Sequence, residues 1–292
     1  MMKMSKEDKI FEAVNLVLLV IVSLLILYPL IYILSQSFSS PRDVYFGTVI
    51  LFPKNLSVTA YKYVLQKPTI WTGYRNTIVY TIIGTLMSLF LLFTASFALS
   101  RKNLVFRKFF MTLFIIPMYF SGGIIPLYIL IDGLGLMNTM WAFILPSLLS
   151  SYYIILTRTY MSSSIPYELQ ESAMLDGAND MLIFFVIILP LCKPIIAVMT
   201  LFSVVGYWNS YFNALIFISD ENKYPLQIVL QQILLQSDTL GGVTDVPNAE
   251  YAMMSESVKY SSIVVATLPI LLAYPFMSKY FEKGLTLGGL KG

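Results

Sequence analysis

Residues 76–100 read NTIVYTIIGTLMSLFLLFTASFALS, a run of 25 residues without one charged side chain. A helix needs about 20 apolar residues to cross the hydrocarbon core of a bilayer, so this run is long enough to span a membrane. Other charge-free runs of at least 19 residues occupy 13–41, 109–131, 133–157, 194–219 and 260–278. The sequence therefore predicts an all-α membrane protein with six transmembrane helices.

The six predicted spans are interrupted at one place. Ser121-Gly122-Gly123 should end the third span, before a re-entrant or interfacial stretch over 124–138. We find neither a repeat nor a linker, and we expect residues 1–292 to form a single transmembrane domain with a C-terminal tail over 279–292. The predicted spans are Ala13–Phe38, Asn76–Ser100, Phe109–Phe120, Met140–Thr157, Pro194–Ile218 and Ser261–Met277.

Composition excludes most enzyme classes. The chain is 57% hydrophobic and 12% charged, has no histidine and has one cysteine, Cys192, whereas soluble domains carry about 25% charged residues. Catalytic pairs and zinc sites that need histidine are excluded, as are cysteine clusters. The Gly-rich end 284–291 lacks the Gly-Lys-Ser/Thr of a phosphate loop. We therefore expect no enzyme activity, cofactor or metal in this chain, and the net charge of +3 is too small to indicate nucleic-acid binding.

The distribution of Lys and Arg predicts the orientation. The side with the termini, the 101–108 loop and the 158–193 loop holds 12 of these residues, and the opposite side holds 7. Because basic residues concentrate on the cytoplasmic side, both termini are expected in the cytoplasm. The predicted location is a membrane, with lipid around the spans.

The span cores contain no ionisable residue that would mark a proton pathway. This argues against a proton-coupled carrier. A self-sufficient secondary carrier that uses sodium and backbone carbonyls remains the alternative to a transporter driven by another chain.

The loop 158–193 is predicted to form two short helices. Ser164 and Pro166 are typical of a helix start, and a helix over Pro166–Leu175 should follow. Gly177 should turn the chain, and Asn179 should cap a second helix, Met181–Leu189, that stops before Pro190. Such a compact protrusion would fit into a groove of a partner protein.

The string Glu171-Ser172-Ala173, followed by Gly177, Ile187 and Leu189-Pro190, resembles the Glu-Ala-Ala loop of binding-protein-dependent ABC importer permeases. One position departs from that pattern: Ser172 stands where the first alanine is usual. Tyr207-Trp208-Asn209 and the ending 279–292 are similar to the shorter permease of the carbohydrate-uptake (maltose-type) subfamily. Residues 224–234 resemble its polysaccharide-fragment branch, with alginate-like and polygalacturonan-like substrates.

The resemblance implies an ABC importer type I permease fold and import of a carbohydrate, with an oligosaccharide favoured, by alternating access. It also implies a location in the cytoplasmic (inner) membrane of a bacterium or archaeon. It implies four kinds of partner: a second homologous permease, a dimer of ATP-binding subunits that hold ATP and Mg, an extracytoplasmic solute-binding protein, and the sugar. Glu171 would contact the ATPase, although an exposed acid on such a loop is also commonly just solvated. The residues implied in ATPase coupling, within 166–190, are Glu168, Glu171, Ala173, Asp176, Gly177, Ala178 and Pro190.

The fifth predicted span carries the candidates for sugar contact. Trp208 and Tyr211 could stack on pyranose rings, and Asn209 and Asn213, one helical turn apart, could bond to hydroxyls. The alternative is structural, because Trp and Tyr gather at membrane interfaces and Asn can bond between helices.

Overall fold

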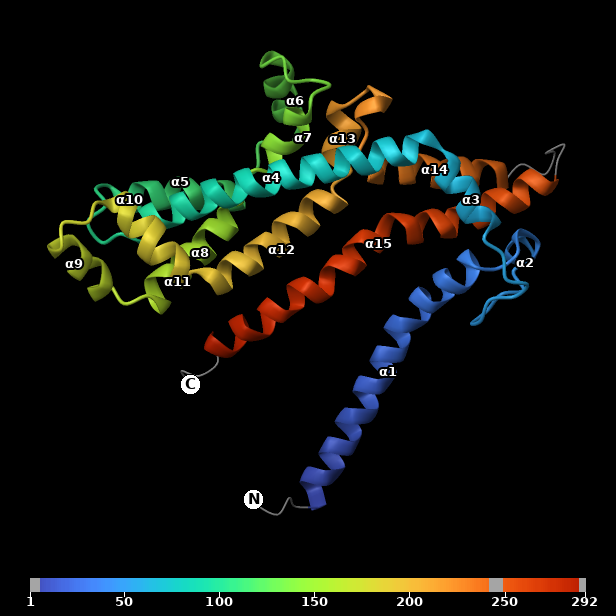
Figure 1. The fold of residues 1–292 in the computed structure, drawn as a ribbon, viewed down its shortest axis with the longest axis horizontal. Helices are drawn as coiled ribbons and strands as arrows, with labels where there is room; N and C mark the ends of the chain where they lie inside the picture. The colour runs from blue at the N-terminus through green and yellow to red at the C-terminus, as the bar shows by residue number, and fades with distance from the viewer. Residues whose placement is uncertain (1–5, 242–248, 289–292) are drawn as a thin grey trace. The chain divides into compact units, whose positions relative to one another are not determined.

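The computed structural model describes residues 6–241 and 249–288, and within them it is helical with no strand (Figure 1). One segment, η2, is a π-helix, and η1 and η3 are single 3₁₀ turns. The elements in chain order are α1 (Lys6–Ser37), α2 (Pro41–Tyr45), α3 (Thr59–Gln66), α4 (Pro68–Ser100), α5 (Arg107–Tyr119), α6 (Ile124–Gly133), α7 (Met140–Ile144), η1 (Leu145–Ser147), α8 (Ser151–Ser164), α9 (Glu168–Leu175), α10 (Asp180–Leu182), η2 (Ile183–Ile188), α11 (Leu189–Leu191), α12 (Lys193–Asn209), α13 (Phe212–Phe217), η3 (Glu221–Lys223), α14 (Leu226–Gly241) and α15 (Ala249–Gly288).

The chain divides into two compact units, one of residues 1–70 and 230–268 and the other of residues 71–229 and 269–292. Helices α4, α14 and α15 each continue from one unit into the other. The single transmembrane domain predicted from the sequence therefore stays a prediction.

In the first unit, the segment after α1 folds back onto the end of that helix. Ser35 Oγ donates to the Leu51 carbonyl at 2.6 Å, and Gln36 Nε2 donates to the Val49 carbonyl at 3.1 Å. Both side chains are buried, and each supplies a hydrogen bond to a backbone carbonyl that lies outside any helix and so has no partner within one. The rest of α1 exposes apolar side chains along most of its length, as expected of a helix in lipid.

The second unit is built around one large apolar cluster. It joins α4 (Leu92, Phe93), α8 (Ile154), η2 (Ile188) and α12 (Met199), all of them almost fully buried. Side chains of α5 pack against the same cluster. This core fixes the helices that carry the 158–193 loop.

Helix α4 connects two polar regions of the second unit. Asn76 bonds to the loop that follows α13, and Arg101, which directly follows the helix, bonds to the 158–193 loop. At 1.5 Å per residue these positions lie roughly 37 Å apart, slightly more than the hydrocarbon thickness of a bilayer. Figure 1 shows α9 and α10 gathered at one end of α4.

Three helices are long and apolar enough to cross a membrane, within α1, α4 and α15, and three bent helix pairs bring the total to as many as six. The predicted break of the third span is confirmed, because α5 ends at Tyr119 and α6 starts at Ile124 after a bend of 115°. The count of six spans itself stays a prediction.

The predicted fourth and fifth spans are wrong as continuous helices. The fourth bends by 51° between Ser147 and Ser151, after a 3₁₀ turn that contains Pro146. The fifth ends at Asn209, because Ser210 takes extended dihedrals, and helix resumes as α13. The sixth is longer than predicted, since α15 runs from Ala249 to Gly288 through most of the predicted tail. Residues 289–292 of that tail lie outside the described residues.

Gly84 sets the closest approach between α4 and α12. A Cβ at Gly84 would lie 2.6 Å from Cζ of Tyr207. The Tyr207 ring is buried, and its hydroxyl lies 3.0 Å from Ser88 Oγ and 3.4 Å from the Ile144 carbonyl, so the ring has little freedom to move aside.

We expect Gly84→Ala to lower the stability of the chain by about 1–3 kcal/mol through overpacking. Thermal unfolding in detergent measures this. Gly206→Ala in α12 is the matched control, because a Cβ there meets nothing within 4 Å. Equal melting temperatures for the two variants would contradict the close packing.

Candidate functional site

The 158–193 loop begins differently from its prediction. Ser164 is the last residue of α8 and caps no helix, and α9 starts at Glu168 after Tyr167. The cause is Ile165, which is buried and extended as residues before proline usually are, and which therefore separates the two helices. The predicted first helix thus exists but is two residues shorter than Pro166–Leu175.

The turn in the middle of the loop is confirmed. Gly177 has φ +84°, in the region that favours glycine, and its position is open enough that an added Cβ would meet nothing within 4 Å. The side chain of Asn179 accepts a hydrogen bond from the Leu182 backbone at 2.9 Å, which is the predicted cap. Glycine is therefore required here by backbone conformation and not by space.

The second helix of the loop does not stop before Pro190. It passes from α10 into the π-helix η2 and then into α11, so Pro190 lies inside one continuous helical stretch, two residues after the π-helical segment ends. The chain bends by 81° after Leu191, at Cys192, before α12 begins. The predicted stop at Pro190 is therefore wrong by two residues.

Arg101 holds the loop from the end of α4. Its guanidinium donates to Gln170 Oε1 at 2.6 Å and to Asp180 Oδ1 at 2.7 Å, so one side chain joins the two helices on either side of the Gly177 turn. Arg101 and Gln170 are each 5% exposed, and the guanidinium lies 5.5 Å from the centre of the Phe97 ring. We call Arg101, Gln170 and Asp180 the arginine clamp.

The sequence alone marked Arg101 only as part of a basic cluster that indicates orientation. Its partners lie 69 and 79 residues further along the chain, and no local pattern connects them. The sequence did contain one sign of a buried polar contact: Gln170 lies on a face of α9 that is otherwise occupied by Ala173 and Met174.

The outer surface of the loop is apolar at its tip and acidic around it. Leu175 is 90% exposed, and Glu168, Glu171 and Asp176 are also exposed. Within residues 6–241 and 249–288, none of these three carboxylates forms an ion pair. By contrast, Ala173 is buried and Ala178 is half-buried against the core, while Pro190 is exposed. We call Glu168, Glu171, Leu175 and Asp176 the acidic tip.

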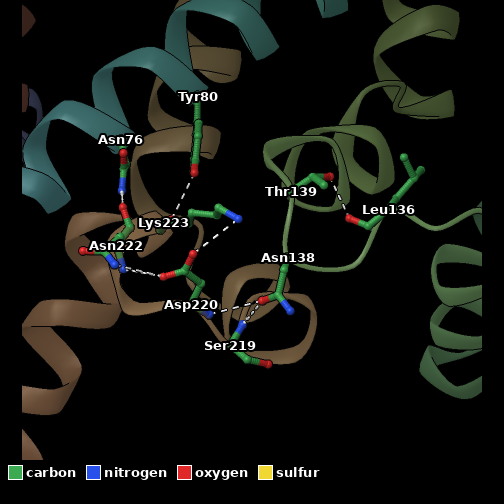
Figure 2. A network of polar contacts seen from close by, with 9 residues as sticks. All are labelled: Asn76, Tyr80, Leu136, Asn138, Thr139, Ser219, Asp220, Asn222 and Lys223. Atoms are coloured by element: carbon green, nitrogen blue, oxygen red, sulfur yellow. Dashed lines mark hydrogen bonds and ion pairs between the residues drawn. The ribbon is translucent and has the colours of Figure 1, made fainter.

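A polar network at the other end of α4 joins three segments (Figure 2). Asn76 Nδ2 donates to the Asn222 carbonyl at 2.8 Å, and the Tyr80 hydroxyl donates to the Lys223 carbonyl at 3.0 Å. The side-chain oxygen of Asn138 accepts from the backbone of Asp220 at 3.1 Å. Hydrogen bonds from the Asn222 backbone and from Lys223 lower the pKa of Asp220, so its carboxylate stays charged to a lower pH than usual. The network fixes the turn between α13 and α14.

The four predicted sugar-contact residues are not on one helix. Trp208 and Asn209 end α12, Tyr211 lies in the break, and Asn213 is in α13, so the predicted face with Asn209 and Asn213 one turn apart does not exist.

The surroundings of these four residues also differ. Asn213 donates to Ser147 Oγ at 2.9 Å, a bond between helical segments, and Asn209 accepts from Gln227 at 3.5 Å. Trp208 is buried, whereas Tyr211 is 43% exposed.

A cavity of about 160 Å³ lies beside Tyr207, a residue that the sequence did not single out as a contact. Its lining residues include several that carry a hydroxyl, among them Ser88, Ser147, Tyr153 and Tyr207. Tyr153 and Phe202 stack on one another there with ring centres 5.6 Å apart. The cavity places hydroxyls and aromatic rings between α4, α8 and α12.

Comparison with known proteins identifies the family. The model of the binding-protein-dependent transport system inner membrane component matches residues 91–287. Protein LplC of Bacillus subtilis is 38% identical, over 99% of this chain and 97% of its own length. The polygalacturonan/rhamnogalacturonan transport system permease protein YtcP of the same organism is 36% identical, over 98% of this chain and 100% of its own length.

A solved structure agrees with these relatives. A chain from a bacterial ABC transporter involved in the import of the acidic polysaccharide alginate is 35% identical, with a TM-score of 0.86 over 96% of this chain and 100% of that one. A match of this quality to a permease favours an ABC permease over the self-sufficient carrier considered from the sequence. The chain belongs to the family of binding-protein-dependent transport system inner membrane components and has the type I permease fold of ABC importers.

Proposed function

We propose that this permease imports an oligosaccharide by alternating access and that its 158–193 loop couples the spans to a separate ATPase. In this proposal the complex also contains a second permease, two ATP-binding subunits that hold ATP and Mg, and an extracytoplasmic solute-binding protein. The chain itself supplies no nucleotide site and no catalytic group.

The acidic tip is the observation that supports coupling most directly. An exposed Leu175, on the same short loop as three exposed carboxylates without ion-pair partners among the described residues, suits a partner groove with an apolar floor and basic rims. The arginine clamp supports the same role, because a loop that transmits motion must be held rigidly to the spans. Ala173 and Ala178 would pack the loop against the core, and Pro190 would precede the bend into α12.

The proposed orientation puts the termini and the acidic tip in the cytoplasm. The excess of Lys and Arg on that side supports it. The length of α4 supports placing the arginine clamp and the Asp220 network on opposite sides of the membrane, since the helix separates them by about one bilayer thickness.

The names of the relatives support an oligosaccharide as substrate. YtcP is named for polygalacturonan and rhamnogalacturonan transport, and the solved relative is a chain of a transporter involved in the import of the acidic polysaccharide alginate. The proposed contacts on the path of the sugar remain Trp208, Asn209, Tyr211 and Asn213. The case for Asn209 and Asn213 is weaker, because their side chains already form hydrogen bonds within the protein.

Copurification and transport test this function together. A tagged chain, expressed with the genes next to its own, should bring down a second permease and an ATPase. The complex in proteoliposomes, supplied with its binding protein and ATP, should accumulate an oligosaccharide. Transport by the chain alone without ATP would overturn the proposal.

Glu171→Lys is expected to weaken the association with the ATPase at least tenfold. A charge-assisted bond at an interface contributes about 1.5–3 kcal/mol, and reversal of the charge adds repulsion. The measurement is the amount of ATPase retained on the tagged complex as salt is raised. Glu12→Lys, which changes an exposed acid of α1, is the control, and equal retention in both variants would remove Glu171 from the interface.

A further inference from the structure

A pocket of about 390 Å³ lies in the first unit, to which all of its lining residues belong. Its walls come from α3 and the residue that follows it, from α14 and from the start of α15, with Ile233 and Met254 among the apolar side chains. In the proposed orientation the pocket lies on the extracytoplasmic side, because these segments fall between the first and second predicted spans and between the fifth and sixth. Its volume is within the range of small-molecule sites.

One basic and one acidic side chain line this pocket without pairing. Lys67 is half-buried, and its ammonium lies 5.0 Å from the centre of the Tyr63 ring, so the side chain is folded over an aromatic face that also lines the pocket. Glu250 is exposed at the start of α15. Among residues 6–241 and 249–288, neither Lys67 nor Glu250 forms an ion pair. Two opposite charges that share a pocket without contact leave room between them for a ligand that bonds to both.

The segments that form the walls carry opposite charge. Residues 37–75, which contain Lys67, hold five basic side chains and one acid, Asp43, whose carboxylate already accepts from Asn55 at 2.8 Å. Residues 219–259, which contain Glu250, hold six acids and two bases. A basic surface attracts anions, whereas a carboxylate accepts hydrogen bonds and repels a second carboxylate. The ligand that suits both walls therefore offers an anion to one of them and hydrogen-bond donors to the other.

We propose that this pocket binds a uronate, a sugar residue that carries a carboxylate, on the extracytoplasmic side of the permease. The carboxylate of the uronate pairs with Lys67, and its hydroxyls donate to Glu250. The ring of Tyr251, which is 66% exposed, offers an apolar surface to the apolar face of the sugar. A neutral sugar would leave Lys67 without a counter-charge, and an anion without hydroxyls would offer Glu250 no donor. The inference rests on the proposed function and deepens it by naming the class of saccharide.

Binding to the purified complex of permeases and ATPase, without its solute-binding protein, tests the pocket directly. The probes are trigalacturonate, in which every residue carries a carboxylate, and maltotriose, which has none, and titration by saturation-transfer NMR gives the Kd. We expect Lys67→Met to raise the Kd for trigalacturonate by about tenfold or more, because a charge-assisted bond is lost. Lys67→Arg keeps the charge and should bind much better than Lys67→Met. Lys62→Met is the matched control, since it removes the same charge from an exposed position of α3 that does not line the pocket, and it should leave the Kd unchanged.

The results that would overturn the inference differ from those that would overturn the proposed function. Equal Kd values for Lys67→Met and Lys62→Met, or equal binding of the two probes by the wild type, would exclude a uronate from the pocket even if the complex imports an oligosaccharide. If Lys67→Met keeps the wild-type Kd but no longer retains the solute-binding protein, the pocket is a docking surface for that protein and the inference is wrong. Binding of trigalacturonate that depends on Lys67, without ATP-driven uptake of any saccharide, would support the pocket and overturn the proposed function.

Discussion

Replacement of Arg101 by methionine is expected to abolish ATP-driven uptake while the chain still inserts into the membrane. Methionine fills a similar volume but leaves the buried Gln170 without its 2.6 Å partner and frees Asp180 from α4. Loss of the hydrogen bond to the buried Gln170 costs about 1.5–3 kcal/mol, and the bond to Asp180, whose side chain is 70% exposed, adds less. The two helices on either side of the Gly177 turn would then lose their shared anchor. Uptake of a transported saccharide and retention of the ATPase are the two measurements.

Two companion variants test whether the effect comes from the lost hydrogen bonds of the arginine clamp or only from the lost positive charge. Lys108→Met removes a positive charge from the first turn of α5, directly after the same short loop, where the lysine is exposed, and should leave uptake unchanged. Arg101→Lys keeps the charge but lacks the planar fork that reaches two acceptors, so it should recover only part of the activity. Wild-type uptake by Arg101→Met would show that the loop is held by its apolar packing alone.

Gly177→Val is expected to have an effect of similar size, for a different reason. The backbone at Gly177 has φ +84°, and a β-branched residue held there is strained by about 1–3 kcal/mol. Because the space around the position is open, the strain comes from the backbone and not from a collision. The turn should open, and the acidic tip should lose its shape. We expect loss of ATPase retention and of uptake, with normal membrane insertion.

The choice of residue at position 177 provides the check. Asparagine tolerates positive φ better than other residues with a side chain, so Gly177→Asn should keep much more activity than Gly177→Val. Gly133→Val, at an exposed glycine without positive φ, controls for the added side chain. If Asn and Val at position 177 are equally active or equally inactive, conformation is not what makes glycine necessary there.

The sequence was sufficient for features that depend on neighbouring residues. Charge-free runs identified the apolar helices, and Ser121-Gly122-Gly123 identified the break between α5 and α6, because span length and chain breaks are local properties. The Gly177 turn and the Asn179 cap were also readable, since each involves a few consecutive residues. The spacing of the loop motif then led to the family.

Predictions from local patterns were wrong where distant contacts or a proline decided the path of the chain. Ser164 resembled a helix cap, yet Ile165 and Pro166 end α8 there. The stretch after Asn209 is apolar enough for a continuous span, but the helix is interrupted at Ser210, and Asn213 of α13 bonds to Ser147. Hydropathy measures how apolar a segment is and not whether its helix continues.

Tertiary structure alone placed the residues that now carry the sharpest tests. Arg101 meets Gln170 and Asp180 only because α4, α9 and the π-helix η2 that follows α10 pack on one apolar core. The sequence by itself determined the apolar, helical character of the chain, the presence of the loop and the family, since these follow from composition and short-range pattern. Which polar side chains are paired was decided by the packing of helices far apart in the chain, because a buried hydrogen bond depends on where its partner lies in space.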